Sequence, residues 1–239
     1  MPERLRVAAY LLTEAARVAD PHLLPRRLAT ALCEGMHAEG AAVTLMPHTT
    51  EAQLLCASDD VALRLEEVQF EVGHGPGTAC AASGKPVVIG DCRRVHPLWP
   101  VFSVVVGEHL PQVQALWSFP VLRGSDVLGA ITLHRTCPWP AHHKVIQQGV
   151  FAAWAVARLL EDLETVLLEE EDETVWEPRD VVDSHWLHAH RAAGMLAEHL
   201  GTTAAHALLL MRARSFGTGT PLPLIAADIA RNPLSWTDS

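Results

Sequence analysis

Residues 73–91 read GHGPGTACAASGKPVVIGD, and this stretch decides how the fold is interpreted. A phosphate-binding loop of the Walker type needs Lys and then Ser or Thr after its last glycine, and GHGPGTACAA has no such lysine. The glycines of GHGPG also stand too close together for a GxGxxG dinucleotide fingerprint. We therefore interpret them as turn residues that deliver TACAAS as a short helix, after which Gly84-Lys85-Pro86 starts a strand.

The surrounding sequence alternates between helical and strand patterns. We predict helices over 22–38 and 61–68, strands over 41–47 and 52–58, and a hairpin over 113–135. The hairpin turns at RGSD, whose residue types turns prefer. Residues 101–110, VFSVVVGEHL, fit either type, because the valines favour a strand and the position favours a helix. The pattern predicts an α+β fold, an antiparallel sheet with flanking helices.

Charge divides the chain. Residues 161–180 carry ten acidic residues and one arginine, whereas the parts on either side are close to neutral. The sequence predicts four segments: an N-terminal amphipathic helix (1–21), an α+β domain with its C-terminal helix (22–168), an acidic linker (169–181) and an all-α three-helix module (182–239).

Composition limits the function classes. No apolar run approaches the roughly 18 residues of a membrane helix, and no signal peptide is clear, so we expect a cytoplasmic protein without a membrane partner. The five cysteines form no CxxC pair, and the 14 histidines form no HExxH motif. No metal site is predicted, and nothing in the sequence specifies a cofactor.

Residues 22–165 resemble the GAF domain, a small-molecule sensor fold. The resemblance rests on GHGPGTACAASGKPVVIGD, on HPLWPVF, and on SFPVLRGSDVLGAITLH, in that order. It implies a ligand pocket between the sheet and the segments 74–80 and 99–106. Strand alternation and position suggest six residues for this pocket: Phe70, His74, Phe102, Trp117, Phe119 and His134.

A catalytic alternative rests on two cysteines. Some GAF proteins resemble free methionine sulfoxide reductases and use cysteine pairs, and Cys80 and Cys92 flank one short segment here. A nucleophilic cysteine needs a base within hydrogen-bond reach and a lowered pKa, and spacing shows neither. A thiol-dependent reductase with a helical dimerisation tail stays open as an alternative to a protein that is not an enzyme.

The C-terminal residues predict three short helices. Thr203 caps the second helix, and Thr220 with Pro221 starts the third. HRAAGMLAEHLGTTAAHAL, LLMRARSFGTGTPL and IAADIA resemble the ANTAR domain, a three-helix RNA-binding module of bacterial antitermination regulators. The resemblance implies a signal-responsive regulator that binds RNA hairpins, so that a transcription terminator does not form. A helix-turn-helix DNA-binding regulator remains a further alternative.

The expected RNA surface is Arg191, Gly194, Arg212 and Arg214. Arg212 and Arg214 are two residues apart and point about 200° from each other on a helix, so we expect Arg191 and Arg214 to act together and Arg212 to matter less. The family often carries Lys or Arg where this chain has Ala193, and the module is net neutral, which puts strong phosphate binding in doubt.

A homodimer is expected from the helix over residues 141–168. Ala153, Val156, Leu160, Leu163 and Leu167 recur at steps of three and four residues, the spacing of a coiled-coil seam. The alternative is a single amphipathic helix that packs on its own domain.

Overall fold

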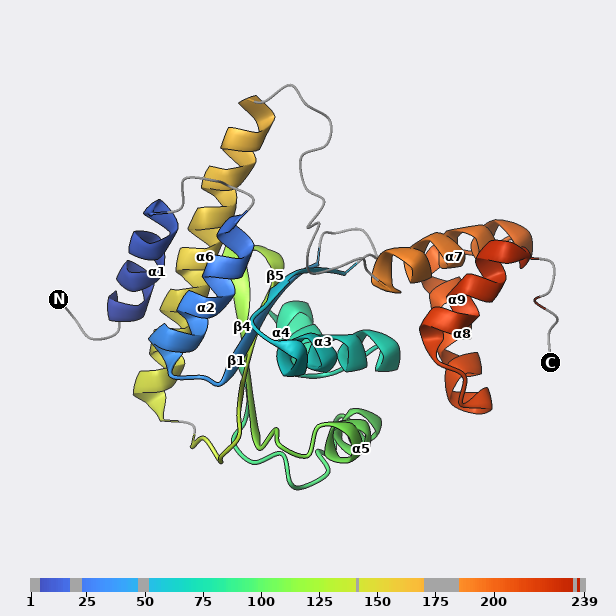
Figure 1. Ribbon diagram of the computed structural model, residues 1–239, viewed down its shortest axis with the longest axis horizontal. Coiled ribbons are helices and arrows are strands. Elements are labelled where there is room, and N and C mark those ends of the chain that lie inside the picture. Colours follow the sequence, from blue (N-terminus) through green and yellow to red (C-terminus); the bar gives the residue numbers. More distant parts are fainter. Residues whose placement is uncertain are drawn as a thin grey trace.

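The computed structural model describes residues 5–17, 23–46, 52–140, 142–169, 185–233 and 236. Figure 1 shows three layers and a separate helical unit. Helices α1 (Arg6–Ala16), α2 (Leu24–Met36) and α6 (His143–Glu169) cover one face of a central sheet, which we call the outer face. Helices α3 (Asp60–Val72), α4 (Pro76–Ser83) and α5 (Pro100–His109) lie on the other, inner face. The predicted α+β fold is confirmed.

The sheet has five antiparallel strands in the order β2-β1-β5-β4-β3. They are β1 (Gly40–Leu45), β2 (Gln53–Ala57), β3 (Val87–Ile89), β4 (Ala115–Arg123) and β5 (Asp126–Arg135). The β4–β5 hairpin turns at RGSD as predicted, with Gly124 at φ +63°. Its register places Ser118 opposite Thr132, and this pairing decides which polar groups meet on the inner face.

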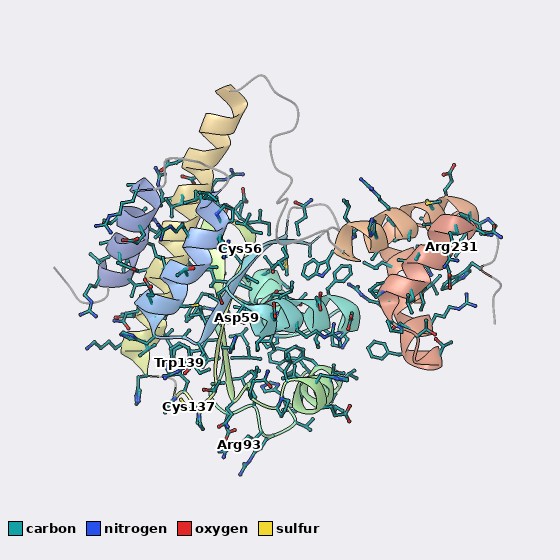
Figure 2. The ribbon with its side chains drawn as sticks, in the orientation of Figure 1. Cys56, Asp59, Arg93, Cys137, Trp139 and Arg231 are labelled. Carbon is teal, nitrogen blue, oxygen red and sulfur yellow. The ribbon has the colours of Figure 1, made fainter. Side chains whose placement is uncertain are left out.

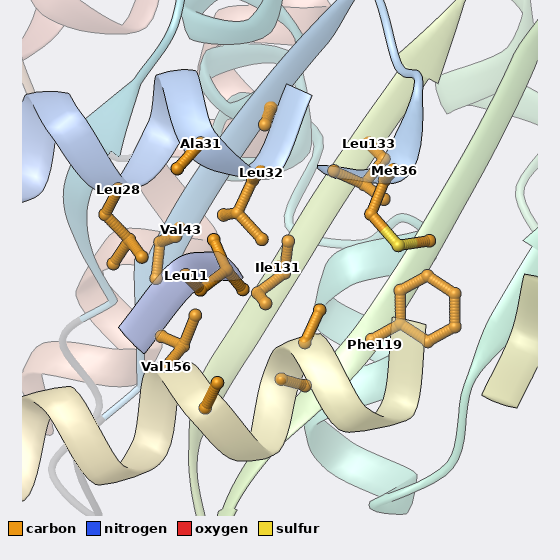
Figure 3. Packing of buried hydrophobic residues seen from close by; sticks show 14 of the residues in the cluster. Leu11, Leu28, Ala31, Leu32, Met36, Val43, Phe119, Ile131, Leu133 and Val156 are labelled. Atoms are coloured by element: carbon orange, nitrogen blue, oxygen red, sulfur yellow. The ribbon is translucent and has the colours of Figure 1, made fainter. Parts of the chain in front are cut away.

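The main hydrophobic core lies between the outer face and its three helices. Figure 3 shows Leu11, Leu32, Val43, Ile131 and Val156 converging there from α1, α2, β1, β5 and α6. Each of these five side chains is at most 1% exposed. The predicted amphipathic N-terminal helix is present, and its apolar stripe closes this core through Leu11.

The glycine-rich segment turns the chain twice on the inner face. Gly73 ends α3 at φ +80°, and Gly84 ends α4 at φ +62°, a region that glycine enters without a Cβ clash. The conformational role that the sequence predicts for these glycines is confirmed. The ambiguous residues 101–110 form most of helix α5, whose Phe102 and Val106, one turn apart, are buried.

The C-terminal unit consists of α7 (His185–Leu200), α8 (Ala204–Thr218) and α9 (Leu222–Arg231). Thr203 caps α8 as predicted, because its hydroxyl oxygen accepts a hydrogen bond from the backbone N–H of His206. The helices approach closely through small side chains, with Ala192 and Ala207 fully buried beside Leu196 and Met211. These side chains form one hydrophobic cluster with Ala42, Leu54, Ala62 and Phe70 of the α+β domain.

Three sequence expectations can be compared only with the residues that the structure describes. The acidic linker predicted at 169–181 lies, beyond Glu169, outside them. Among the helices that are described, none is long and apolar enough to cross a membrane. No group of three or more His, Cys, Asp or Glu side chains within the same residues is arranged to hold a metal ion.

Candidate sensory site and output interface

A buried polar cluster joins α3 to the inner face of the sheet. The Glu66 side chain, on a residue only 2% exposed, accepts a hydrogen bond from the Thr44 hydroxyl (2.7 Å) and another from Gln69 Nε2 (2.7 Å). Burial raises the pKa of the Glu66 carboxyl, and hydrogen bonds from Thr132, Thr44 and Gln69 oppose that rise. The cluster places a carboxyl group and two hydroxyl groups under helix α3.

Gln69 connects this cluster to the glycine-rich segment. Its side-chain carbonyl Oε1 accepts a 2.6 Å hydrogen bond from the backbone N–H of Gly77, in the first turn of α4. The amide of Gln69 thus bonds Glu66 on one side and α4 on the other. A change at Glu66 would therefore affect the contacts of both α3 and α4.

His134 forms a second polar site near the start of α3. Its Nε2 lies 3.6 Å from Oδ1 of Asp59, the N-cap residue of α3, which Figure 2 labels. Burial lowers the pKa of the imidazole, and Asp59 opposes this shift. Within the described residues, neither ring nitrogen of His134 has a hydrogen-bond partner, nor does the buried hydroxyl of Ser118. All three polar atoms are fully buried.

The predicted pocket residues do not all share one face. Phe102 and His134 belong to the inner side, as expected. Trp117 and Phe119 share a face, but it is the outer one, so the prediction that they line a pocket with Phe102 and His134 is wrong. The indole of Trp117 stacks on Trp139 with ring centroids 4.2 Å apart. Phe119 lies in the core under the outer helices, as Figure 3 shows.

The two remaining pocket candidates point elsewhere. His74 is exposed at the turn between α3 and α4. Phe70 is buried, but its ring stacks on Trp186 of the C-terminal unit, in a hydrophobic cluster that also includes Ala42 and Leu54 of the sheet. The cysteines of the reductase alternative are set in apolar surroundings, and burial raises the pKa of both Cys80 and Cys92 to about 12.

The C-terminal unit docks on α3 through a compact set of contacts. Trp186 of α7 stacks on Phe70 with centroids 4.6 Å apart and 10° between the ring planes. Arg212 of α8 donates a 2.8 Å hydrogen bond from Nε to the Phe70 carbonyl, and its guanidinium lies 5.1 Å from the Phe70 ring centroid. Burial lowers the pKa of Arg212 to about 10. We call Phe70, Trp186 and Arg212 the docking interface.

The other predicted RNA residues lie away from this interface. Arg191 and Gly194 are exposed on α7. The guanidinium of Arg214 lies 4.5 Å from the ring centroid of Trp236, and Arg231, labelled in Figure 2, pairs with Asp228 at 2.6 Å. Arg212 and Arg214 therefore point in different directions, as their spacing predicts.

Part of the expected dimer seam packs against its own domain. Ala153 and Val156 are buried in the core under the outer face, and Leu160 packs against it. The expectation that Val156 is available to a second chain is thus wrong, because the sheet already covers it. The side chains of Leu163 and Leu167 lie outside the described residues.

Comparison with known proteins agrees with this architecture. Residues 20–159 match the GAF domain family. The GAF domain of a Coxiella burnetii phosphoenolpyruvate-protein phosphotransferase has 14% identity and a TM-score of 0.52, covering 69% of this chain and 96% of that one. The Acinetobacter counterpart has 12% identity and a TM-score of 0.51, covering 70% and 98%.

An enzyme shares the same fold. Free methionine-R-sulfoxide reductase from Neisseria meningitidis, solved with its substrate, has 13% identity and a TM-score of 0.50, covering 68% of this chain and 91% of that one. No curated protein matches the sequence. At these identities the structural similarity establishes the fold alone.

Proposed function

This chain belongs to the GAF domain family, and we propose that it is a signal-responsive RNA-binding regulator that acts by transcription antitermination. The sensor is the GAF domain, whose inner face would receive a small molecule. The output is the C-terminal three-helix unit, whose sequence resembles the ANTAR domain. Two chains would present two such units to paired RNA hairpins.

One observation supports physical coupling between the GAF domain and the C-terminal unit. On helix α3, Gln69 bonds the buried cluster of the sheet, and the next residue, Phe70, holds the C-terminal unit. A ligand that rearranged the contacts of Glu66 and Gln69 would shift α3 and with it the carbonyl and ring that bind Arg212. The ligand must prefer one of the two arrangements for this coupling to work.

The docking interface also bears on RNA affinity. Arg212 is one of only four arginines in the C-terminal unit, and in the docked arrangement its Nε–H is bonded to Phe70. RNA affinity rests largely on cationic side chains that neutralise phosphates. Release of the unit would free the Arg212 guanidinium, so that one more of the four arginines could contact phosphate. The docked arrangement is then the weaker RNA binder.

The reductase alternative gains no support from the cysteine environments. A thiol with a pKa of about 12 is protonated at neutral pH, whereas an attacking cysteine must be a thiolate. We therefore place the function in binding and not in thiol chemistry.

Direct binding tests the proposal. The full chain is titrated with a labelled RNA that carries two hairpins, with a single-hairpin RNA, and with duplex DNA of equal length, over a salt series. We expect the two-hairpin RNA to bind most tightly and its affinity to fall with salt. Equal binding of duplex DNA would favour the helix-turn-helix alternative, and binding of none of the three would refute RNA recognition.

A further inference from the structure

A cavity of about 230 Å³ lies where the C-terminal unit meets α3. Helix α3 contributes Arg64, Glu67, Phe70 and Glu71 to its walls, and α7 contributes Trp186. These α3 side chains belong to a different face of the helix from Glu66 and Gln69, which contact the sheet cluster. The cavity is thus separate from the inner face of the GAF sheet, and it has walls from both units.

Charge on the α3 wall favours a cation. The Arg64 guanidinium bonds both carboxylate oxygens of Glu71, at 3.0 and 3.1 Å, and one oxygen of Glu67 at 3.0 Å. Two carboxylates therefore share a single guanidinium, which leaves one net negative charge on this wall. All three side chains are partly shielded from solvent, so the charge is screened less than on an open surface.

The opposite wall is poor in donors for an anion. A helix N-terminus attracts anions through its free backbone N–H groups. At the start of α9, however, Pro221 and Pro223 line the cavity, and proline has no N–H to donate. The apolar part of the wall is completed by the stacked pair of Phe70 and Trp186, of which Phe70 already faces the Arg212 guanidinium, 5.1 Å from its ring centroid. The Trp186 indole is therefore the ring that can attract a further cation electrostatically.

From these walls we infer that the cavity is an effector site for a small organic amine with an apolar body. The ammonium group would bind beside Glu67 and Glu71, and the apolar body would lie along Trp186 and the prolines. The volume of about 230 Å³ is below the roughly 300–1,000 Å³ of typical ligand pockets, so only a compact molecule would fit. Because the walls come from both units, an occupant stabilises the docked arrangement.

Three probes that share a phenyl group but differ in charge test whether the cavity prefers a cation. The full chain is titrated by calorimetry with 2-phenylethylammonium, with the neutral 2-phenylethanol and with the anionic 3-phenylpropionate. We expect saturable binding of the ammonium probe below about 10 mM and at least fivefold weaker binding of the other two. Equal binding of 3-phenylpropionate, or no saturation by the ammonium probe, would overturn the inference.

Substitutions in the α3 wall test whether the ammonium probe binds in this cavity. Glu67→Gln removes one carboxylate but leaves the paired contact of Arg64 with Glu71, so the preference for the ammonium probe should fall at least fivefold. Glu71→Gln provides an independent second test, and Glu108→Gln, on the exposed side of α5, is the matched control that should change nothing. Unchanged preference in both wall variants would place the binding elsewhere and refute the site.

Hydrogen exchange tests the bridging role. Saturating 2-phenylethylammonium should slow amide exchange in both α3 and α7, because the occupant would touch both. Slowing in α3 alone would refute the bridge while leaving a site on the sensor. None of these experiments uses RNA, so a failure of the proposed amine site is distinguishable from a failure of the proposed RNA-binding function.

Discussion

The Phe70 ring and the Trp186 indole stack at 4.6 Å, and this contact joins the sensor domain to the C-terminal unit. Both residues are almost fully buried, at 7% and 5% exposed. Phe70 follows Gln69 directly, so the contact begins one residue from the buried cluster of the sheet. The docking interface therefore lies next to the buried cluster along helix α3.

Trp186→Ala should undock the C-terminal unit. Truncating a buried tryptophan costs about 3–5 kcal/mol of stability, and here much of the lost contact lies between the units. We expect faster amide exchange in α3 and tighter binding of a two-hairpin RNA, since Arg212 is released. Phe216→Ala is the matched control, because Phe216 is 52% exposed on α8. Equal effects of the two substitutions would contradict this role for Trp186.

Glu66→Gln should reduce the dependence of stability on pH. The folded-state pKa of Glu66 lies above its usual 4.5, so the folded protein retains a proton that the unfolded chain releases. Its contribution to stability is complete below pH 4.5 and is lost as pH rises through the folded-state pKa. Glutamine keeps the neutral form and can still accept from Gln69 and donate to the Thr44 hydroxyl.

Urea denaturation at pH 5 and pH 8 measures this difference. The free energy of unfolding of Glu66→Gln, relative to wild type, should rise between the two pH values. Glu108→Gln, exposed on α5, should follow the wild type at both. A constant difference between Glu66→Gln and wild type would show that the carboxyl is already ionised in the fold at pH 5.

Gly149→Ala and Gly107→Ala should have opposite effects on stability. A Cβ at Gly149 of α6 would lie 2.1 Å from the Phe119 ring, which is fully buried and cannot move away. We expect a loss of about 1–3 kcal/mol from overpacking. A Cβ at Gly107 of α5 meets nothing within 4 Å, so alanine should gain about 0.5–1 kcal/mol through helix propensity. Thermal denaturation of both variants distinguishes the two positions.

Local signals predicted the elements well. The RGSD turn, the Thr203 cap and the positive-φ glycines each act over a few residues, and each occurs as expected. The valines of residues 101–110 were ambiguous because strand propensity is weak, and burial of one helical stripe decided the outcome.

Long-range packing explains the errors. Strand alternation correctly placed Trp117 and Phe119 on one face of the sheet. Whether that face lines a pocket or packs under α1, α2 and α6 depends on the whole fold. Glu66 and Gln69 were missed because a charged, amphipathic helix predicts a solvated polar face, and only the sheet opposite reveals that these two are buried.

A homodimer remains our expectation, but through a different stripe of α6. Val150 and Trp154 are one turn apart and 44% and 50% exposed, whereas Ala153 and Val156 are buried. Light scattering at high micromolar concentration should give twice the 26.0 kDa of one chain. Trp154→Glu should lower this mass, and Trp154→Phe should retain it. A single-chain mass for the wild type would refute the dimer.

The last prediction concerns the RNA surface. Arg191 is exposed on α7 and Arg214 is half-buried beside Trp236, and both lie away from the docking interface that holds Arg212. Arg191→Ala and Arg214→Ala should each weaken binding of a two-hairpin RNA and flatten its logarithmic salt slope by about 0.7–1, as expected for one lost phosphate contact.

Two further variants separate the charge effect from its position. Arg94→Ala removes one exposed cation from the sensor domain and should leave both affinity and slope unchanged. Arg212→Ala removes a cation that could contact RNA only after release, and also a hydrogen bond that holds the docked unit. The two effects oppose each other, so the net change should be smaller than for Arg214→Ala. If Arg191→Ala and Arg214→Ala match Arg94→Ala while the fold persists, the RNA surface is not where these arginines place it.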